Sequence, residues 1–234
     1  MICGLQKMTL LDYPGKVACT VFLGGCNFRC PFCHNSELFM GKPEKLMEED
    51  VFFQFLEKRK GLLDGVCVSG GEPTLYKELP EFLRRIRELG FSVKLDTNGS
   101  RPQVLRELVA RGLVDYVAMD VKNAPTMYAQ AVGLESCDLQ NIEESLRLLI
   151  GGTTPYELRT TLVAQLHTEA SIQDMGVWLA GVVPGKQPEK LFLQSFVDRD
   201  TVLFSGLSAP EPEATARFAK ILAPFVGEVA IRNP

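Results

Sequence analysis

This chain of 234 residues has no long apolar run, no excess of positive charge and only two histidines. No apolar run approaches the roughly 18 residues that a membrane-spanning helix needs, so we expect no membrane partner. The formal net charge is −4, which argues against a broad basic surface for nucleic acid, so no nucleic-acid partner is expected either. The first residues lack the charged-then-apolar pattern of an export signal, and we therefore expect a cytoplasmic protein.

Cysteine is instead abundant, with seven residues against only two histidines. An odd number of cysteines without an export signal argues against a disulfide framework, so reduced thiols remain for packing, metal binding or redox chemistry. Three of the seven are clustered in one loop. The other four are scattered and are expected to pack in the core or to have no role: Cys3, Cys19, Cys67 and Cys137.

Short β-branched or aromatic runs alternate with longer stretches of helical period along the chain. The expected strands cover residues 16–23, 65–68, 92–95, 115–121, 156–163, 190–196 and 228–231. Amphipathic patterns predict helices near residues 51–56, 79–89, 104–109, 139–150, 172–179 and 214–225. Six strand–helix units and a final strand predict a parallel sheet, either open and doubly wound or a partial barrel. We expect one domain over residues 1–234, with a core at about 16–200, a short amino-terminal segment and a carboxyl-terminal helix–strand extension.

Polar motifs directly follow four of the expected strands, at the carboxyl ends where α/β proteins place their sites. They are GGCNFRCPFCHN at residues 24–35, SGGEPT at 69–74, DTNG at 96–99 and DVKN at 120–123. Small, charged and amide residues are also ordinary helix caps and turn formers, so any one motif could be simple turn chemistry. Four such motifs on one rim, one of them with three cysteines, favour a shared site.

Cys26, Cys30 and Cys33 form C-x3-C-x2-C, which is compact enough for three thiolates to converge on one centre. A structural zinc site normally needs four ligands, and His34 is a poor fourth because it adjoins Cys33. The segment 30–34 also fits c-type haem attachment, which needs an exported chain, or a thioredoxin-like dithiol, which leaves Cys26 unexplained. A four-iron cluster with three protein ligands would leave one iron open to another ligand.

The cysteine motif, with Phe32 before its last cysteine, and Gly70-Gly71-Glu72-Pro73 after the second strand together resemble the radical S-adenosylmethionine (SAM) superfamily. A narrower resemblance lies at residues 5–40, where the segment LDYPGK at residues 11–16 precedes the cysteine loop. This segment is similar to glycyl-radical-enzyme activases, most of all to the anaerobic ribonucleoside-triphosphate reductase activating proteins. The likeness continues through the motifs near Glu72, Asp96 and Asp120, and it fades toward the carboxyl end.

The resemblance implies a partial (β/α)6 TIM-like barrel, open on one side, that binds a [4Fe-4S] cluster and SAM. The three clustered cysteines would ligate iron, and Phe32 would lie against the adenine. Gly70, Gly71 and Glu72 would receive the methionyl amine. The other matching positions would hold the ribose and the methionine carboxylate: Asp96, Asn98, Asp120, Lys122 and, as a looser match, Arg159. These residue types suit SAM, because carboxylates accept hydrogen bonds from its ammonium and a cation binds its carboxylate.

The implied activity is reductive cleavage of SAM to a 5′-deoxyadenosyl radical that removes hydrogen from a glycine of a partner enzyme. The expected partners are a glycyl-radical enzyme, first of all anaerobic ribonucleotide reductase, and an external low-potential electron donor such as flavodoxin or ferredoxin. Alternatives are activation of another glycyl-radical enzyme of the pyruvate formate-lyase type, a radical SAM reaction on a small molecule, and a non-enzymatic zinc or dithiol redox protein.

Three smaller expectations complete the interpretation. No cysteine lies between Cys33 and Cys67, so a second, ferredoxin-like cluster is not expected. His167 is expected at the surface near a helix start. The stretch 197–210 after the sixth expected strand is expected, by its position, to face the partner enzyme.

Overall fold

The structure is a computed structural model that describes residues 1–40 and 44–232. The chain divides into two compact units. Unit 1 comprises residues 1–27, 35–97 and 103–118, and unit 2 comprises residues 28–34, 98–102 and 119–234. The single domain expected from the sequence stays a prediction.

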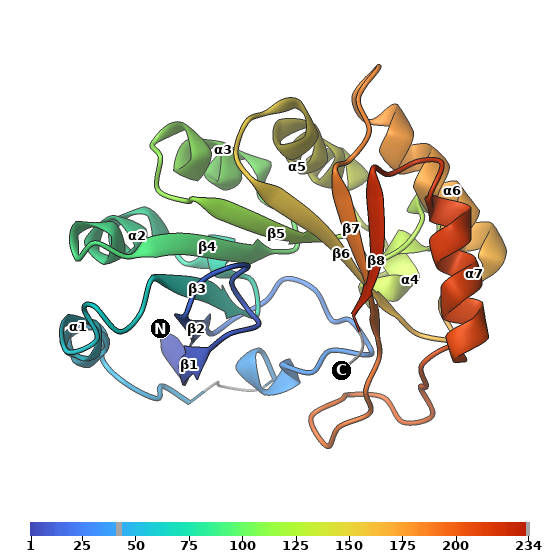
Figure 1. The fold of residues 1–234 in the computed structure, drawn as a ribbon. Coiled ribbons are helices and arrows are strands. Elements are labelled where there is room, and N and C mark those ends of the chain that lie inside the picture. Colours follow the sequence, from blue (N-terminus) through green and yellow to red (C-terminus); the bar gives the residue numbers. More distant parts are fainter. Residues whose placement is uncertain (41–43, 233–234) are drawn as a thin grey trace. The chain divides into compact units, whose positions relative to one another are not determined.

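The described residues contain eight strands and seven α-helices, which alternate after β2 except that α4 and α5 both lie between β5 and β6 (Figure 1). The strands are β1 (Ile2–Thr9), β2 (Ala18–Leu23), β3 (Gly65–Gly70), β4 (Ser92–Thr97), β5 (Tyr116–Asp120), β6 (Tyr156–Leu162), β7 (Lys190–Ser195) and β8 (Glu228–Arg232). The helices are α1 (Glu49–Glu57), α2 (Leu79–Glu88), α3 (Pro102–Ala110), α4 (Tyr128–Ala131), α5 (Leu139–Gly151), α6 (Glu169–Gly181) and α7 (Pro212–Leu222). Each expected strand and each expected helix is present, and the short helix α4 adds to them.

The strands of the sheet follow one another in chain order from β1 to β8. A doubly wound sheet reverses its strand order at a switch point, whereas a barrel adds each strand on the same side of the last, as here. The first and last strands lie at opposite ends of that order, so the sheet of the described residues is not closed. The predicted α/β class, with an open and mostly parallel sheet of the partial-barrel type, is confirmed.

In unit 1, β2, β3 and β4 are parallel neighbours. Side chains alternate between the two faces of a strand, so residues that pair across strands share a face. The register joins Thr20 to Cys67 and Cys67 to Lys94, which places these three on one face. Val21, Val68 and Leu95 pair in the same way on the other face, and all three are fully buried: 0% of each is exposed.

The first strand, β1, was not predicted from the sequence. It pairs antiparallel with β2, with register shifts between Ile2 and Gly4 and between Gln6 and Thr9. Its central residues are half-buried or exposed, and it lies at the end of the strand order. An edge strand of this kind carries Gly, Gln and Lys instead of alternating apolar residues, so its hydrophobic pattern is weak.

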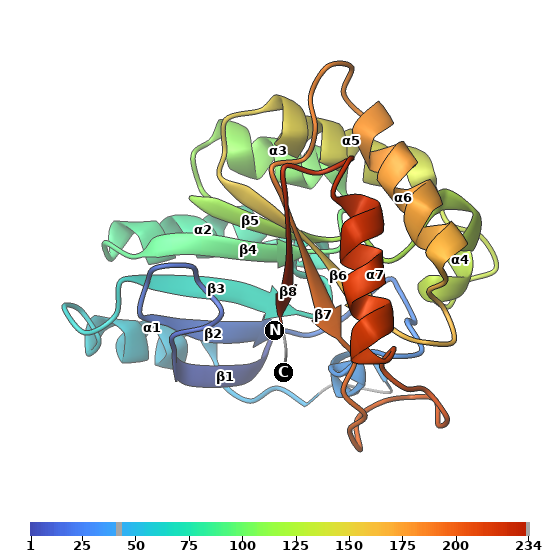
Figure 2. The same ribbon diagram turned by 45° about the vertical axis from the view of Figure 1, so that its right-hand side comes forward.

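In unit 2, β6, β7 and β8 are parallel and the helices α4 to α7 belong to the same unit (Figure 2). The hydroxyl of Thr160 on β6 lies 3.9 Å from the Met175 sulfur on α6, so this face of β6 points toward that helix. Arg159 is one position away and therefore lies on the opposite face. The helix α6 begins at a capping box between Thr168 and Ser171.

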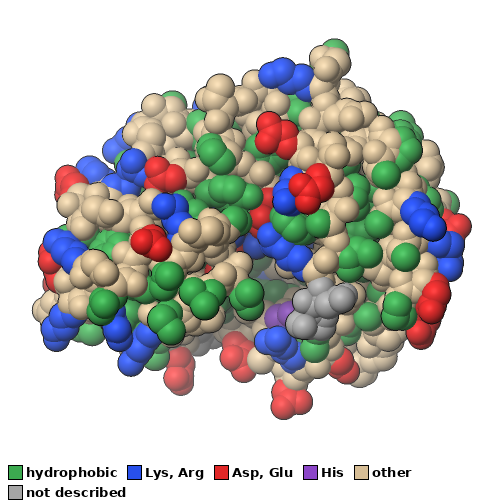
Figure 3. Space-filling model, in the orientation of Figure 1, with side chains coloured by type: hydrophobic (Ala, Val, Ile, Leu, Met, Phe, Trp, Pro, Cys, Tyr) green, Lys and Arg blue, Asp and Glu red, His purple; other side chains and the backbone are tan. Residues whose placement is uncertain are grey.

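No helix among the described residues has both the length and the apolar character to cross a membrane. On the face drawn in Figure 3, acidic and basic side chains are interspersed with apolar ones, and neither sign of charge gathers into a single area.

Candidate functional site

The cysteine loop begins in unit 1 directly after β2. Gly25 has a positive φ of 95°, a conformation that favours glycine, and its N–H donates to the carbonyl of Leu38 at 2.7 Å. Cys26 follows, is half-buried and is not part of a disulfide. The chain therefore turns at Gly25 after β2, and the first cysteine of the motif directly follows this turn.

The other two cysteines of the motif belong to unit 2. Cys30 is buried, Cys33 is half-buried, and the Cys33 N–H donates to the Cys30 carbonyl at 3.1 Å. Gly133 supports the start of this segment: a Cβ atom there would lie 2.1 Å from the Arg29 carbonyl oxygen, so only glycine fits. The turn at Cys30–Cys33 places both thiols on a short, backbone-bonded segment.

His34, next to Cys33, binds the chain after β7 in the same unit. Its Nε2 atom lies 2.6 Å from the Val197 carbonyl, and its ring stacks on Phe196 with centroids 5.7 Å apart. Burial lowers the pKa of His34, while the bond to Val197 acts in the opposite direction. The imidazole is thus a tether between the cysteine segment and the loop after β7, a contact that the sequence did not indicate.

The glycine pair after β3 makes close backbone contact with the segment that carries Cys26. A Cβ atom on Gly70 would lie 2.2 Å from the Leu23 carbonyl oxygen, and one on Gly71 would lie 2.1 Å from the Gly25 carbonyl oxygen. Gly71 N–H donates to Leu23 at 3.0 Å and Glu72 N–H donates to Gly25 at 2.8 Å. The two glycines therefore let the loop after β3 bond directly to the cysteine loop in unit 1.

Glu72 is a buried carboxylate, with 1% of its surface exposed. Its Oε1 atom accepts from the Thr74 N–H at 3.1 Å, from the Thr74 hydroxyl, and from the Thr97 hydroxyl at 2.8 Å. Buried carboxylates require such donors, because an unpaired one is costly. Neither threonine was predicted as part of the site, although both directly follow predicted residues in the motifs.

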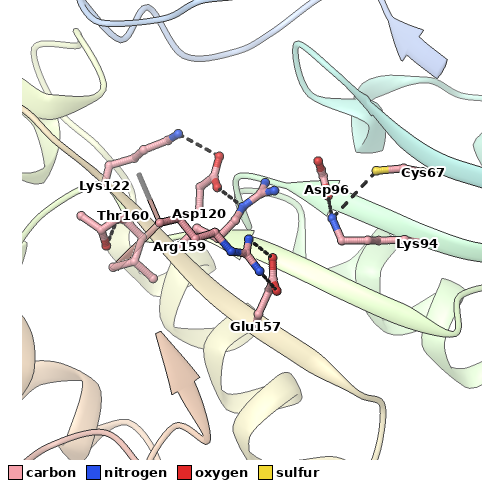
Figure 4. Close-up of polar contacts among 10 residues, drawn as sticks. Cys67, Lys94, Asp96, Asp120, Lys122, Glu157, Arg159 and Thr160 are labelled. Carbon is pink, nitrogen blue, oxygen red and sulfur yellow. Dashed lines mark hydrogen bonds and ion pairs between the residues drawn. The ribbon is translucent and has the colours of Figure 1, made fainter. Parts of the chain in front are cut away.

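Asp96 lies at the end of β4 and accepts from a buried lysine of the same strand, Lys94 (Figure 4). Lys94 is 1% exposed, and its ammonium nitrogen also lies 3.8 Å from the Cys67 sulfur. The sequence offered no signal for Lys94, since a lysine within a strand is typical of an ordinary surface position.

Asn98 and the following Gly99 form a turn in unit 2. Asn98 is buried, and its side-chain oxygen accepts from the Ser100 N–H at 3.0 Å. The Gly99 carbonyl accepts from the buried Ser145 hydroxyl at 2.7 Å. The positive φ of 75° favours glycine at 99, where a Cβ atom would meet only the flexible end of the Met119 side chain.

Asp120, Lys122 and Arg159 form one ion-pair group in unit 2 (Figure 4). Asp120 accepts from Lys122 at 2.9 Å through Oδ2 and from the Arg159 Nε atom at 2.9 Å through Oδ1. The Lys122 ammonium also lies 5.8 Å from the centre of the Phe32 ring. Burial acts to lower the pKa of Lys122, but attraction to Asp120 and to the Cys30 and Cys33 thiolates outweighs it, and the net pKa is raised.

The segment that carries Lys122 is fixed by buried polar groups. Asn123, fully buried, donates to the Leu166 carbonyl at 2.7 Å, and His167 Nε2 lies 3.0 Å from the Lys122 carbonyl. His167 is only 3% exposed, so the predicted surface position is wrong. It does precede α6, but its second ring nitrogen accepts from the Val163 N–H at 3.1 Å, and burial lowers its pKa.

The structure thus groups the predicted residues as two sets. Unit 1 holds Cys26 with the glycine pair and Glu72, and it holds Asp96 with Lys94. Unit 2 holds Cys30, Cys33, Phe32, Asn98 and the Asp120 group. Among the described residues, no three His, Cys, Asp or Glu side chains form a group that could hold a single metal ion.

Residues 20–167, more than half of the chain, match the sequence profile of the Radical SAM superfamily. The chain belongs to this superfamily. Radical SAM proteins use a [4Fe-4S] cluster bound by three cysteines, together with SAM. The membership and the cofactors predicted from the sequence are therefore confirmed.

Curated relatives of this radical SAM protein include activating enzymes. It is 32% identical over 242 residues to a "Putative glycyl-radical enzyme activating enzyme" of Methanocaldococcus jannaschii, with 100% of this chain and 96% of that protein covered. It is 32% identical over 128 residues to the pyruvate formate-lyase-activating enzyme of Clostridium pasteurianum, with 52% of each covered. The 7-carboxy-7-deazaguanine synthase of Koribacter versatilis is 27% identical over 165 residues, with 70% of each covered.

Solved structures share the fold of this radical SAM protein. TYW1 with a lysine–pyruvate adduct has a TM-score of 0.63 at 17% identity, over 88% of this chain and 73% of the TYW1 chain. SuiB of Streptococcus suis bound to S-adenosylmethionine has a TM-score of 0.67 at 10% identity, over 92% of this chain but 51% of the SuiB chain. At these identities the likeness shows the fold alone.

Proposed function

We propose that this protein is a glycyl-radical-enzyme activase that cleaves SAM reductively and acts on anaerobic ribonucleotide reductase in the cytoplasm. The observation that carries the proposal is the likeness to an activating enzyme of M. jannaschii over the whole chain. When bound, the cluster supplies the low-potential electron that breaks the S–C5′ bond of SAM and yields the 5′-deoxyadenosyl radical. An external donor such as flavodoxin or ferredoxin would provide that electron.

Cys26, Cys30 and Cys33 fit the cluster in their chemistry. None of the three is part of a disulfide, and thiolates are the ligands that iron–sulfur clusters require. Attraction to Asp120, and after it to the thiolates of Cys30 and Cys33, raises the pKa of Lys122, and the same ammonium stabilises the thiolate form that the cluster requires. We propose that these three cysteines bind the cluster.

The residues of unit 1 suit the cationic end of SAM. Glu72 is a buried carboxylate held by two threonines, and a fixed carboxylate is a strong acceptor for an ammonium group. Gly70 and Gly71 would bring backbone carbonyls to the same group. Asp96 would accept from the ribose hydroxyls, because a carboxylate accepts from two neighbouring hydroxyl groups.

The residues of unit 2 suit the anionic end and the adenine. Two cations, Lys122 and Arg159, donate to the carboxylate of Asp120, and cations of this kind would also bind a methionine carboxylate. Asn98 is fixed in its turn and would bind the ribose. Phe32 lies beside Lys122 and would stack on the adenine.

The proposal is tested with protein reconstituted under anaerobic conditions. We expect about four irons and four sulfides per chain, and methionine with 5′-deoxyadenosine after reduction in the presence of SAM. Cys30→Ala should lose both the cluster and SAM cleavage. Cys19→Ala is the matched control, because Cys19 is fully buried in β2 and burial raises its pKa to about 12. Full SAM cleavage by Cys30→Ala would contradict the cluster assignment, and one zinc without sulfide would favour a zinc or dithiol redox protein.

The partner is identified by electron paramagnetic resonance. Incubation with anaerobic ribonucleotide reductase, SAM and reductant should produce the doublet of a glycyl radical on the reductase. The similarity to a pyruvate formate-lyase-activating enzyme makes pyruvate formate-lyase the second candidate. The similarity to a 7-carboxy-7-deazaguanine synthase makes a small molecule the third. A radical on pyruvate formate-lyase alone, or on neither enzyme, would reject the reductase as the target.

A further inference from the structure

Lys94 is the most deeply buried charged side chain beside the candidate SAM residues of unit 1. It lies within β4, is 1% exposed, and its ammonium group donates to Oδ1 of Asp96 (Figure 4). Lys94 and Asp96 are two positions apart on one strand, so their side chains share a face. The register places Cys67 of β3 directly beside Lys94, and the ammonium nitrogen lies 3.8 Å from the Cys67 sulfur.

A lysine in this position needs an explanation beyond stability. Burial of an ammonium group carries a desolvation cost, and an apolar side chain would fill the same space without it. Along β4 the side chains of Val93 and Leu95 point to the other face, and on the face of Lys94 the neighbour on β3 is Cys67, which is fully buried and only weakly polar. The ammonium group is therefore directed at one carboxylate.

The effect of the lysine on Asp96 is to fix its orientation and to balance its charge. A carboxylate has about four acceptor positions, so engagement of Oδ1 by Lys94 leaves capacity for ligand hydroxyl groups. Thr97, the next residue, donates to Glu72 at 2.8 Å, so the end of β4 also holds the second carboxylate of unit 1. The ammonium group of Lys94 balances the negative charge of the Asp96 carboxylate.

We propose that Lys94 is a positioning residue that holds the Asp96 carboxylate in the orientation in which it accepts hydrogen bonds from the ribose hydroxyls of SAM. The proposal rests on the proposed function, because it takes Asp96 as a SAM contact. Lys94 acts through Asp96 and does not itself touch the ligand.

A double-mutant cycle on the full-length, cluster-reconstituted protein tests this role. The dissociation constant of SAM is measured by anaerobic equilibrium dialysis for the wild type, Lys94→Met, Asp96→Asn and the double variant. We expect roughly tenfold weaker binding for Lys94→Met, the lower end of what outer-shell partners of a ligand contribute. Asp96→Asn should also weaken binding, and the double variant should bind no more weakly than Asp96→Asn alone.

Two further variants make the outcome unambiguous. Cys67→Ala removes the other neighbour of the ammonium group and should leave the dissociation constant unchanged. Lys94→Gln keeps a hydrogen-bond donor and should bind SAM with intermediate affinity. If Lys94→Met does not retain the cluster, this variant shows whether Lys94 positions Asp96.

Three results would overturn the inference. Wild-type affinity in both Lys94 variants would show that Asp96 needs no positioning. An equal loss from Lys94→Met in the wild-type protein and in the Asp96→Asn variant would show a general structural role. A wild-type protein that holds its cluster but binds no SAM would refute both this inference and the proposed function, whereas the first two results leave the proposed function intact.

Discussion

Single polar side chains in the interior hold the segments that carry the candidate ligands. His167 illustrates how one residue does this, because each of its ring nitrogens contacts a different part of the backbone. Nδ1 accepts from the Val163 N–H at 3.1 Å, and Nε2 lies 3.0 Å from the Lys122 carbonyl. Nδ1 also lies 3.2 Å from the Val163 carbonyl, but the Val163 N–H can only donate, so Nδ1 acts as the acceptor and the neutral imidazole carries its proton on Nε2.

The protonation of His167 predicts a pH dependence of stability. Burial lowers its pKa in the folded protein, while the unfolded chain has a histidine pKa of about 6.5. The unfolded state therefore binds more protons as the pH falls below that value, and the free energy of unfolding should decrease. Urea unfolding of the reduced, metal-free protein at pH 7.5, 6.5 and 5.5 measures this loss.

The control for this experiment is the second histidine. His167→Gln should remove a large part of the decrease between pH 7.5 and 5.5, whereas His34→Gln should remove less. His34 is only half-buried, and its bond to Val197 opposes the effect of burial on its pKa. A slope in His167→Gln equal to that of the wild type would show that His167 does not link folding to pH.

The sequence indicates those parts of the candidate site whose residues lie at a fixed spacing within a motif. Cys26, Cys30 and Cys33 are close together in sequence, so their spacing indicates one shared centre, and the resemblance to the radical SAM superfamily then implies which centre it is. Thr97 and Lys94 act on Glu72 and Asp96 through contacts that depend on strand register and side-chain direction, and these do not appear in a motif. The prediction for His167 failed for the same reason: its polar character suggested the surface, but its backbone partners are 4 and 45 residues away.

Among the elements, the loop after β3 makes a close backbone contact with the first part of the cysteine loop. Gly71→Ala would place a Cβ atom 2.1 Å from the Gly25 carbonyl oxygen and 3.1 Å from the Cys26 Cβ. Both neighbours belong to backbone or to its first side-chain atom, so the two loops must move apart. We expect a loss of about 1–3 kcal/mol in the free energy of unfolding, typical of overpacking, and a several-fold lower iron content after reconstitution.

Gly151→Ala is the matched control for Gly71→Ala. Gly151 ends α5, its φ is not positive, and a Cβ atom there would have no neighbour within 4 Å. The change should be neutral, or stabilising by up to about 1 kcal/mol, because alanine is the better helix residue. Thermal melts and iron assays of both variants decide the matter: equal iron contents would show that the glycine contact does not hold the cysteine loop.

The sequence predicted strands and helices correctly where their hydrophobic periodicity is strong. It missed the strand β1 at the edge of the sheet and the short helix α4. The stripe of α2 and the buried runs of β2, β3 and β6 are dictated by burial on one or both faces. The strand β1 has no such pattern, because its pairing with β2 depends on backbone bonds and its central side chains are half-buried or exposed. The four-residue helix α4 is too short to show a period at all.

At the scale of the whole molecule, the strand order decides between a doubly wound sheet and a partial barrel. The alternation of strands and helices in the sequence is compatible with both. Alternating strands and helices are common to doubly wound sheets and barrels, and the order of strands is a property of tertiary packing. The order from β1 to β8 without a reversal is the winding of a barrel. The choice of partner enzyme also depends on the folded molecule, because loops that recognise a partner have no motif that can be identified in the sequence.

The segment between β7 and α7 is the proposed partner-facing loop, and the structure gives it a specific anchor and a specific exposed residue. Its end is held by Ser208, whose carbonyl accepts from Ala164 N–H at 2.8 Å, and its start by the His34–Val197 contact. Phe204 lies between these anchors with 57% of its surface exposed. An exposed aromatic ring on an anchored loop is the kind of residue that dominates protein interfaces.

We therefore predict that Phe204→Ala lowers the rate of glycyl-radical formation on anaerobic ribonucleotide reductase by about tenfold or more at limiting reductase, as truncation of an interface aromatic does. SAM cleavage without the reductase should be unchanged, because Phe204 lies outside the residues proposed to bind the cluster and SAM. Leu62→Ala is the control, since Leu62 is 64% exposed but follows α1, away from this loop in the sequence. Equal radical yields from both variants, measured by electron paramagnetic resonance, would exclude the loop from partner recognition. A joint loss of SAM cleavage and radical formation in Phe204→Ala would instead show that the loop supports the SAM site through the adjoining His34 contact.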